Sequence, residues 1–233
     1  MRIALLGYGK MGKIIEQIAI SRGHEIIIKA TKDTDYNITE SDVAIEFSVP
    51  DAAVKNISNC INNNVPVVSG TTGWLENYND MVALCNEKGS AFLYASNFSL
   101  GVNIFFELNK QLAKMMNQFD QYNVKIEEIH HTQKLDKPSG TAITLADGII
   151  EEHQGYNNWA LEESKNSTIA IDAKRIPEVP GTHIITYSSE VDTISISHEA
   201  HNREGFALGA VLAAEWILNK KGVFSMKDVL NIG

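Results

Sequence analysis

The sequence has little cysteine and no long apolar run, and each shortage excludes a class of protein. Its two cysteines, Cys60 and Cys85, have neither the spacing of a metal site nor a catalytic context. We therefore expect buried free thiols and a reducing, cytoplasmic setting. No run of about 18 apolar residues is present, which argues against a membrane-spanning helix, and no signal peptide pattern precedes the first apolar segment.

Basic residues are also scarce relative to acidic ones. The chain has 20 lysines and arginines against 29 aspartates and glutamates, which gives a formal net charge of −9. An acidic surface argues against nucleic acid and against anionic membranes as partners. A protein with this charge that binds an acid must gather positive groups locally, and one segment described below does so.

The first half of the chain alternates short apolar runs with helical patterns. Strands are predicted at 2–6, 25–30, 43–47, 66–69 and 91–95, with helices between them at 11–21, 51–61 and 76–87. Strands that alternate with helices form a parallel sheet with right-handed crossovers. We therefore expect an α/β fold built on a Rossmann-like, doubly wound parallel sheet.

The pattern changes after residue 103. Further helices are predicted at 102–116 and 204–219, a strand with one wet face at 124–129, an antiparallel hairpin at 183–187 and 193–198, and a polar surface loop at 156–168. This mixture is typical of an α+β domain. We expect such a domain, residues 103–205, to be inserted into a first domain made of residues 1–102 and 206–233.

A glycine-rich loop follows the first predicted strand. The segment Gly7-Tyr8-Gly9-Lys10-Met11-Gly12 fits the pattern G-x-G-x-x-G at the start of a helix. Glycines there permit a tight turn, the approach of a pyrophosphate and close packing of helix on strand, and the pyrophosphate meets free N–H groups at the helix N-terminus. Residues 1–102 and 206–233 are thus predicted to be a dinucleotide-binding domain for NADPH or NADH.

The choice between the two cofactors depends on the loop after the second strand. NAD sites place an acidic residue there, on the ribose 2′-hydroxyl. Here the position falls at Thr31 and Lys32, which could accept a 2′-phosphate, while Asp33 comes slightly late. This favours NADP slightly, with NAD also used, although Lys32 can equally be a solvated loop charge.

The densest set of reactive side chains lies at residues 128–142. In order, the segment carries His130, His131, Lys134, Ser139, Gly140 and Thr141. The histidines end a strand, the lysine lies in a loop, and the last three residues open a helix whose free N–H groups attract anions. Together they predict a receptor for carboxylates beside acid-base groups. The plainer alternative is a surface loop, a capped helix and two incidental histidines.

Four blocks of the sequence match one known family. They are His130-His131-x-x-Lys134-x-Asp136-x-Pro138-Ser139-Gly140-Thr141-Ala142, Gly70-Thr71-Thr72-Gly73, Ala95-Ser96-Asn97-Phe98-Ser99-x-Gly101-Val102-Asn103, and the tail with Gly181-x-His183 and His198-x-Ala200-x-x-Arg203-x-x-Phe206-Ala207-x-Gly209-Ala210. The first block is long and specific, and the match spans nearly the whole chain. The sequence therefore resembles the dihydrodipicolinate reductase (4-hydroxy-tetrahydrodipicolinate reductase) family.

The resemblance implies a function. It implies a cytoplasmic homotetramer that reduces 4-hydroxy-tetrahydrodipicolinate, a small dianionic ring, with NADPH or NADH in the diaminopimelate pathway to lysine, without a metal. Residues 103–205 would bind substrate and form the oligomer.

It also implies roles for particular residues. His130 would act as acid-base residue and Lys134 as proton donor, with the division of tasks left open. The substrate carboxylates would meet His131, Ser139, Gly140 and Thr141. Beyond residues 7–12, the cofactor would meet Gly70, Thr71, Thr72, Ala95, Ser96, Asn97 and Phe98.

The sequence departs from the family at one loop. Glycines usually follow the arginine that matches Arg175, whereas here the run 176–180 contains two prolines, which leaves the role of Arg175 open. The remaining histidines match no catalytic role. We expect His183 and His198 to be structural, although His183 could touch the site, and His24, His153 and His201 to lie at the surface.

Two other functions stay open. The first is another two-domain NAD(P) dehydrogenase that acts on a small amino acid such as aspartate. The second is a dinucleotide sensor without activity. The block that begins at His130 favours the reductase, because the fold alone does not fix the function and a sensor is expected to have lost His130 or Lys134.

Overall fold

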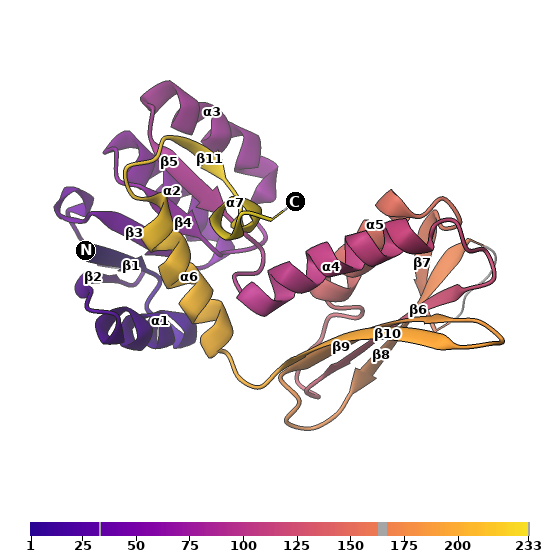
Figure 1. Ribbon diagram of the computed structural model, residues 1–233. Helices are drawn as coiled ribbons and strands as arrows, with labels where there is room; N and C mark the ends of the chain where they lie inside the picture. The colour runs from indigo at the N-terminus through magenta and orange to yellow at the C-terminus, as the bar shows by residue number, and fades with distance from the viewer. Residues whose placement is uncertain (33, 163–166, 233) are drawn as a thin grey trace. The chain divides into compact units, whose positions relative to one another are not determined.

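The computed structural model describes residues 1–32, 34–162 and 167–232 (Figure 1). The chain divides into two compact units, and each is described by itself. The first unit consists of Met1–Leu100 and Glu204–Gly233, and the inserted unit consists of Gly101–Arg203.

The first unit is built on a six-stranded parallel sheet. Its strands are β1 (Arg2–Leu6), β2 (Glu25–Ala30), β3 (Val43–Glu46), β4 (Val67–Ser69), β5 (Ala91–Tyr94) and β11 (Gly222–Phe224), in the order β11-β5-β4-β3-β1-β2. The central strands are buried on both faces, as parallel strands require. The predicted α/β fold is confirmed, and β11 is an edge strand that the sequence pattern did not indicate.

Helices cover both faces of this sheet. They are α1 (Lys10–Ser21), α2 (Pro50–Asn62), α3 (Tyr78–Lys88), α6 (Glu204–Ile217) and the short α7 (Met226–Leu230), with single turns at Ile38–Glu40 and Leu75–Asn77. Buried residues of α1 and α6 form one apolar core with the sheet, and those of α2 and α3 form the other. Both cysteines are buried free thiols in the second core, as predicted.

The inserted unit holds a five-stranded mixed sheet. Its strands are β6 (Asn123–His130), β7 (Asn158–Leu161), β8 (Thr168–Arg175), β9 (Gly181–Ser188) and β10 (Thr193–Ala200), in the order β10-β9-β6-β8-β7. Strand β6 pairs antiparallel with β9 and parallel with β8, and β9 forms the predicted hairpin with β10. Helices α4 (Leu100–Met116) and α5 (Gly140–Glu152) pack on one face of the sheet through a shared apolar core.

Alternation along β6 decides which side chains reach that core. Val124 and Ile126 are buried with the helices, and Glu128 and His130 are buried in the same alternation. The intervening Lys125 is exposed. The predicted strand with one wet face is confirmed, and its period of two sends a carboxylate and an imidazole to the covered side.

Two predictions for the inserted unit are wrong. Residues 158–161 of the expected surface loop form β7, a four-residue edge strand that polar residues flank, and 163–166 lie outside the described residues. His153, expected at the surface, is 4% exposed at the end of α5 and accepts a hydrogen bond from the Gly155 amide at 3.1 Å. Within the described residues, no helix is long and apolar enough to cross a membrane.

Candidate active site

The residues predicted to bind the dinucleotide gather at one edge of the parallel sheet. They follow the carboxyl ends of β1, β2, β4 and β5, in loops 7–12, 31–32, 70–72 and 95–98. Strand β1 lies between β2 and β3, so the direction in which the chain winds reverses there. Open α/β sheets bind ligands at such a reversal, outside the carboxyl ends of the strands.

The three glycines of the first loop have different surroundings. Gly7 has φ +104°, and an added Cβ would lie 2.0 Å from the carbonyl oxygen of Phe47. A Cβ on Gly12 would lie 2.4 Å from the carbonyl oxygen of Gly7, whereas one on Gly9 would have nothing within 4 Å. The first and third glycines are needed by the fold itself, and the second leaves space at the start of α1. This cradle fits a pyrophosphate.

The Tyr8 side chain of this loop is engaged elsewhere. The Tyr8 hydroxyl donates to Glu16, which also forms an ion pair with Lys29, and the Lys29 ammonium lies 5.3 Å from the Tyr8 ring centroid. The backbone groups of the loop and the exposed Lys10 side chain remain for a cofactor. Thr31 and Lys32 are exposed after β2, where they can reach a ribose substituent.

A buried carboxylate that the sequence analysis missed ties the loop after β4 to the end of β3. Glu46, at the end of β3, is fully buried. It accepts hydrogen bonds from the Ser69 hydroxyl at 2.7 Å, the Thr71 hydroxyl at 2.9 Å, the Ser48 amide at 3.1 Å and the Ser48 hydroxyl. A charged residue in an otherwise apolar strand was the available signal. Phe98, predicted as a cofactor residue, is 2% exposed, so only its backbone can serve a ligand.

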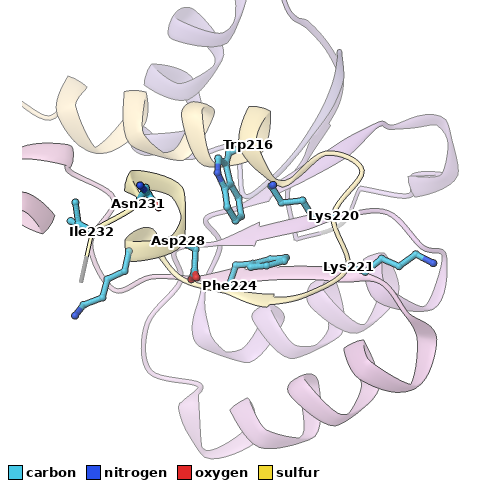
Figure 2. Close-up of a pocket in the computed structure, with 8 residues that line it drawn as sticks. Trp216, Lys220, Lys221, Phe224, Asp228, Asn231 and Ile232 are labelled. Atoms are coloured by element: carbon cyan, nitrogen blue, oxygen red, sulfur yellow. The ribbon is translucent and has the colours of Figure 1, made fainter.

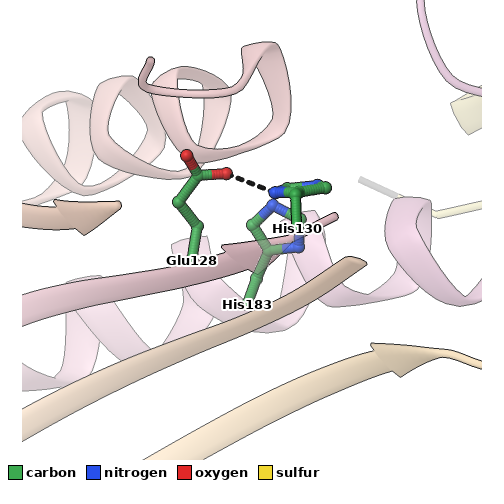
Figure 3. A group of neighbouring side chains, drawn as sticks. All are labelled: Glu128, His130 and His183. Carbon is green, nitrogen blue, oxygen red and sulfur yellow. Dashed lines mark ion pairs between the residues drawn. The ribbon is translucent and has the colours of Figure 1, made fainter. Parts of the chain in front are cut away.

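The inserted unit brings together Glu128, His130 and His183 (Figure 3). The register of β6 against β9 places Glu128 directly opposite His183. The His130 Nδ1 lies 2.6 Å from the Glu128 Oε2, and the two imidazole rings are 5.1 Å apart in an edge-to-face arrangement. All three residues are buried, so their charges are only weakly screened by water. His183 thus belongs to the site, which its position in the sequence did not settle.

The two neighbours of His130 have opposite electrostatic character. Burial acts to raise the pKa of Glu128, but hydrogen bonds from His130, Ser139 and Arg175 outweigh it and lower that pKa to about 2. Burial, together with the nearby His130, lowers the pKa of His183 to about 3. At neutral pH Glu128 is therefore an anion and His183 is uncharged. His130 is the remaining candidate for acid-base chemistry in this group.

Lys134 lies in the loop that follows these strands. Its Nζ is 2.8 Å from the Asp136 Oδ2, and the charge of Lys134 is one of the causes that lower the pKa of His183. The backbone amide of Lys134 donates to the His131 carbonyl at 3.1 Å. The ammonium is thus held close to the histidines by its own short turn.

The start of α5 lies beside the same group. Ser139 caps the helix, because its hydroxyl accepts from the Ala142 amide at 3.2 Å and lies 3.2 Å from the His183 Nε2. Ser139 is 2% exposed, so its side chain is occupied within the protein. Gly140 is exposed and Thr141 is partly exposed, and their N–H groups lie in the first turn of α5, where an anion is favoured.

A hollow of about 390 Å³ in the inserted unit includes His131. It is lined by His131, Thr132, Gln133, Pro177, Glu178, Pro180, Asn202 and Arg203. A larger hollow, about 570 Å³, lies in the first unit between α6, β11 and α7 (Figure 2). None of the predicted site residues lines it, the Lys220 ammonium lies over the Trp216 ring, and Asp228 caps α7. The smaller hollow is lined by one predicted site residue, His131.

The buried trio also has the donor atoms of a metal site. One ligand atom from each of the three residues lies within 4.8 Å of the others. Ligands of a zinc-like ion lie about 2.0–2.2 Å from the metal and are spread around it, whereas the Glu128 and His130 atoms touch at 2.6 Å. Arg175 adds a positive charge 3.0 Å from the other Glu128 oxygen. The arrangement fits a carboxylate that holds an imidazole better than it fits a cation site.

The two units define a class of protein. A doubly wound sheet with a glycine cradle at its switch point, joined to an inserted sheet with a buried carboxylate-imidazole pair, is the build of a two-domain nicotinamide-dependent oxidoreductase. Sequence comparisons give the particular family. The models for the N-terminal and C-terminal parts of dihydrodipicolinate reductase match residues 1–98 and 101–230. The chain belongs to the dihydrodipicolinate reductase family.

Individual relatives agree with this assignment. The chain is 56% identical to the 4-hydroxy-tetrahydrodipicolinate reductase of Christiangramia forsetii over 99% of this chain and 98% of the relative. Its identity to the Thermosipho africanus enzyme of the same name is 37%, again over 99% and 98%.

Solved structures show the same fold. A dipicolinate-bound dihydrodipicolinate reductase from Paenisporosarcina sp. has a TM-score of 0.78 at 24% identity and 97% coverage of both chains. Aspartate dehydrogenase from Thermotoga maritima reaches 0.51 at 15% identity, covering 96% of this chain and 99% of its own. The alternative amino-acid dehydrogenase thus shares the architecture, and the family models separate the two readings.

Proposed function

We propose that the chain catalyses the NAD(P)H-dependent reduction of 4-hydroxy-tetrahydrodipicolinate to tetrahydrodipicolinate in the diaminopimelate pathway to lysine. The observation that carries the proposal is the His130 imidazole, held by an ionised Glu128, with the Lys134 ammonium close by, in a chain whose two parts both match this reductase family. We further propose that the enzyme works in the cytoplasm as a homotetramer, as its resemblance to the family implies.

The substrate is recognised by its two negative charges. The N–H groups of Gly140 and Thr141 at the start of α5, together with the Lys134 ammonium, offer donors to one carboxylate. His131, which lines the hollow of the inserted unit, faces the other. This local set of donors allows a protein of negative net charge to bind a negatively charged substrate.

The reduction requires side chains that hold and donate protons. The bound cofactor supplies a hydride to the ring, and the ring hydroxyl leaves as water, so the reaction consumes one proton in addition to the hydride. The ionised Glu128 carboxylate lies 2.6 Å from His130 Nδ1, which favours a proton on that atom and leaves Nε2 to exchange one with the substrate. Lys134 is the second donor, released from Asp136 when a substrate carboxylate takes that place.

The proposal is tested by a turnover assay. NADPH and NADH oxidation would be followed with freshly made product of the dihydrodipicolinate synthase reaction, and NAD⁺ and NADP⁺ reduction would be followed with aspartate. We expect turnover with the first substrate and both cofactors. Turnover with aspartate alone would establish the amino-acid dehydrogenase instead, and tight NADPH binding without any turnover would establish the sensor.

A further inference from the structure

Arg175, whose role the sequence left open, is enclosed by acceptors. It ends β8 directly beside His130 in the register of β6 with β8, and its side chain is only 12% exposed. The guanidinium donates to the Glu128 Oε1 at 3.0 Å, to the carbonyl of Asp136 at 2.6 Å, to that of Lys134 at 3.3 Å and to that of Lys174 at 2.7 Å. Only arginine has a planar guanidinium with several N–H donors in a fixed geometry, and here these donors reach acceptors on several sides.

These contacts reach both members of the proposed catalytic pair. Through Glu128, which touches the His130 Nδ1 at 2.6 Å, Arg175 fixes the carboxylate that orients the imidazole. Through the backbone carbonyls at 134 and 136, it fixes the turn that carries the Lys134 ammonium and its partner Asp136. No other side chain in the part of the chain that the structure describes is recorded with hydrogen bonds to both the carboxylate and this turn.

Neighbouring groups add constraints but do not duplicate this connection. The Ser139 amide also donates to the Glu128 Oε1, at 3.2 Å, and a Cβ on Gly181 would lie 3.1 Å from the His130 Nε2. The charged or titratable side chains around His130 come from its own strand (Glu128), from β8 (Arg175) and from β9 (His183), and Lys134 lies in the loop that follows β6. Among them, Arg175 is the side chain that donates both to Glu128 and to the backbone of the turn that carries Lys134.

We propose that Arg175 is a positioning residue that sets the separation and orientation of His130 and Lys134, through Glu128 on one side and the loop carbonyls on the other. The inference rests on the proposed function, because it assumes that His130 and Lys134 are the catalytic pair. It also accounts for the glycine-poor run after Arg175. A stiff 176–180 segment, whose Ile176 amide donates to the His130 carbonyl at 2.8 Å, holds the end of β8 in place.

The first test compares three variants of the full-length enzyme. R175A removes all the bonds and should lower kcat by about 10–100-fold with an unchanged NADPH Kd, since misplaced catalytic groups cost rate rather than cofactor affinity. R175K keeps the charge but not the planar fork, and should lie close to R175A. K174A is the matched control, because Lys174 contributes only its backbone carbonyl to Arg175 and should retain wild-type kcat.

The second test separates positioning from a general loss of order. Removing the Arg175 charge favours a protonated His130, so the limb of the kcat pH profile that depends on His130 should move to higher pH in R175A. In E128Q it should move to lower pH. The double variant should be no slower than the slower single variant if the two residues act as one unit. Millimolar guanidinium should restore part of the R175A rate and none of the K134A rate.

The outcomes are distinct. If the wild-type enzyme turns over and R175A matches its kcat and pH profile, the inference is wrong and the proposed function stands. If R175A is slower by the same factor at every pH and guanidinium does not restore activity, Arg175 only stabilises the fold, which also overturns the inference. If R175A fails to fold, R175K and the E128Q profile decide, because a wild-type rate in R175K excludes a role for the fork. Absence of wild-type turnover would instead refute the proposed function.

Discussion

Each unit of the protein contains a fully buried glutamate, and the two are satisfied in different ways. Glu46 in the first unit accepts only from neutral groups, the hydroxyls of serine and threonine and one backbone amide. Glu128 in the inserted unit lies against an imidazole and accepts from a guanidinium. The two residues share the same type and the same burial, but their hydrogen-bond donors differ in chemistry.

The difference matches what each unit has to do. Neutral donors around Glu46 join the ends of β3 and β4 and shape the loops predicted to bind the dinucleotide, a task without proton transfer. Donors around Glu128, the Arg175 guanidinium among them, hold its pKa near 2, so it stays an anion beside the histidine proposed to gain and lose protons. A buried carboxylate therefore indicates function through its partners and not through its burial.

The largest expected effect separates chemistry from binding. H130A and K134A should each lower kcat by about 10²–10⁴-fold, as expected when general acid-base catalysis is lost. The NADPH Kd should stay within about 2-fold of wild type, because both residues belong to the inserted unit, as steady-state kinetics and a fluorescence titration would show. If K134A keeps nearly the wild-type kcat, Lys134 is not the proton donor.

Some of this organisation could be predicted from the sequence. Apolar runs and glycines reflect local geometry, so the order of strands and helices in the first unit and the cradle at 7–12 were predictable. Strands β7 and β11 and helix α7 were missed, because such short segments gain their structure from neighbours already in place. Strand β8 was missed as well, and it begins in the segment expected to be a polar loop.

The connections within the site could not be predicted. Glu128 meets His183, and His130 lies beside Arg175, only through the register of β6 with β9 and β8, between residues 45 or more positions apart. The spacing of Glu128 and His130 by two along one strand was visible in the sequence. Its meaning depends on which face of the strand the helices cover, which is a tertiary property.

The next effect tests the glycine cradle of the first unit. G7A should destabilise the enzyme by about 2 kcal/mol or more, because a Cβ at φ +104° would also overlap the Phe47 carbonyl. G9A should change stability by about 1 kcal/mol or less, since its Cβ has open space, yet weaken NADPH binding at least 10-fold by filling the pyrophosphate site. Thermal unfolding and NADPH titration measure the two effects. Unchanged affinity in G9A would place the pyrophosphate elsewhere.

Matched substitutions of the two glutamates by glutamine test directly whether their two networks differ in function. In E46Q one acceptor oxygen becomes a donor among hydroxyl and amide donors, which should cost about 1–3 kcal/mol of stability and weaken NADPH binding several-fold. Its kcat at saturating NADPH should stay within about 3-fold of wild type, whereas E128Q should lose kcat with an unchanged NADPH Kd. Equal effects of both variants on both quantities would show that the two networks do not differ in function.

Acid should destabilise the inserted unit in a window set by His183. An unfolded histidine binds a proton below about pH 6.5, but folded His183 stays neutral until its pKa of about 3. The unfolded state therefore binds more protons in between, and stability falls as the pH is lowered from 6.5, by up to about 1.4 kcal/mol per pH unit for one such group. The contribution of Glu128 to stability is lost only at lower pH, as the pH falls from about 4.5 toward its folded pKa of about 2.

Urea unfolding between pH 5 and 7.5 measures this window. H183Q keeps a hydrogen-bonding side chain beside Ser139 and cannot bind the proton, so its stability should depend less on pH. His201 is exposed, and H201Q should retain the wild-type slope. Identical slopes in H183Q and wild type would mean that other groups, His153 among them, cause the acid sensitivity.

The smallest expected effect concerns Lys32 and the preference for NADPH over NADH. Lys32 is the charged residue after β2, at the position where a ribose 2′-substituent is read, and it is exposed. An exposed charge contributes little because water and salt screen it, so K32A should reduce the preference for NADPH over NADH by about 3–10-fold. K88A, at the far end of α3, should leave the ratio of kcat/KM for the two cofactors unchanged. If K32A weakens NADPH and NADH equally, Lys32 does not read the 2′-phosphate. Cofactor choice would then depend on the neutral groups of the loop, with Thr31 the next residue to replace.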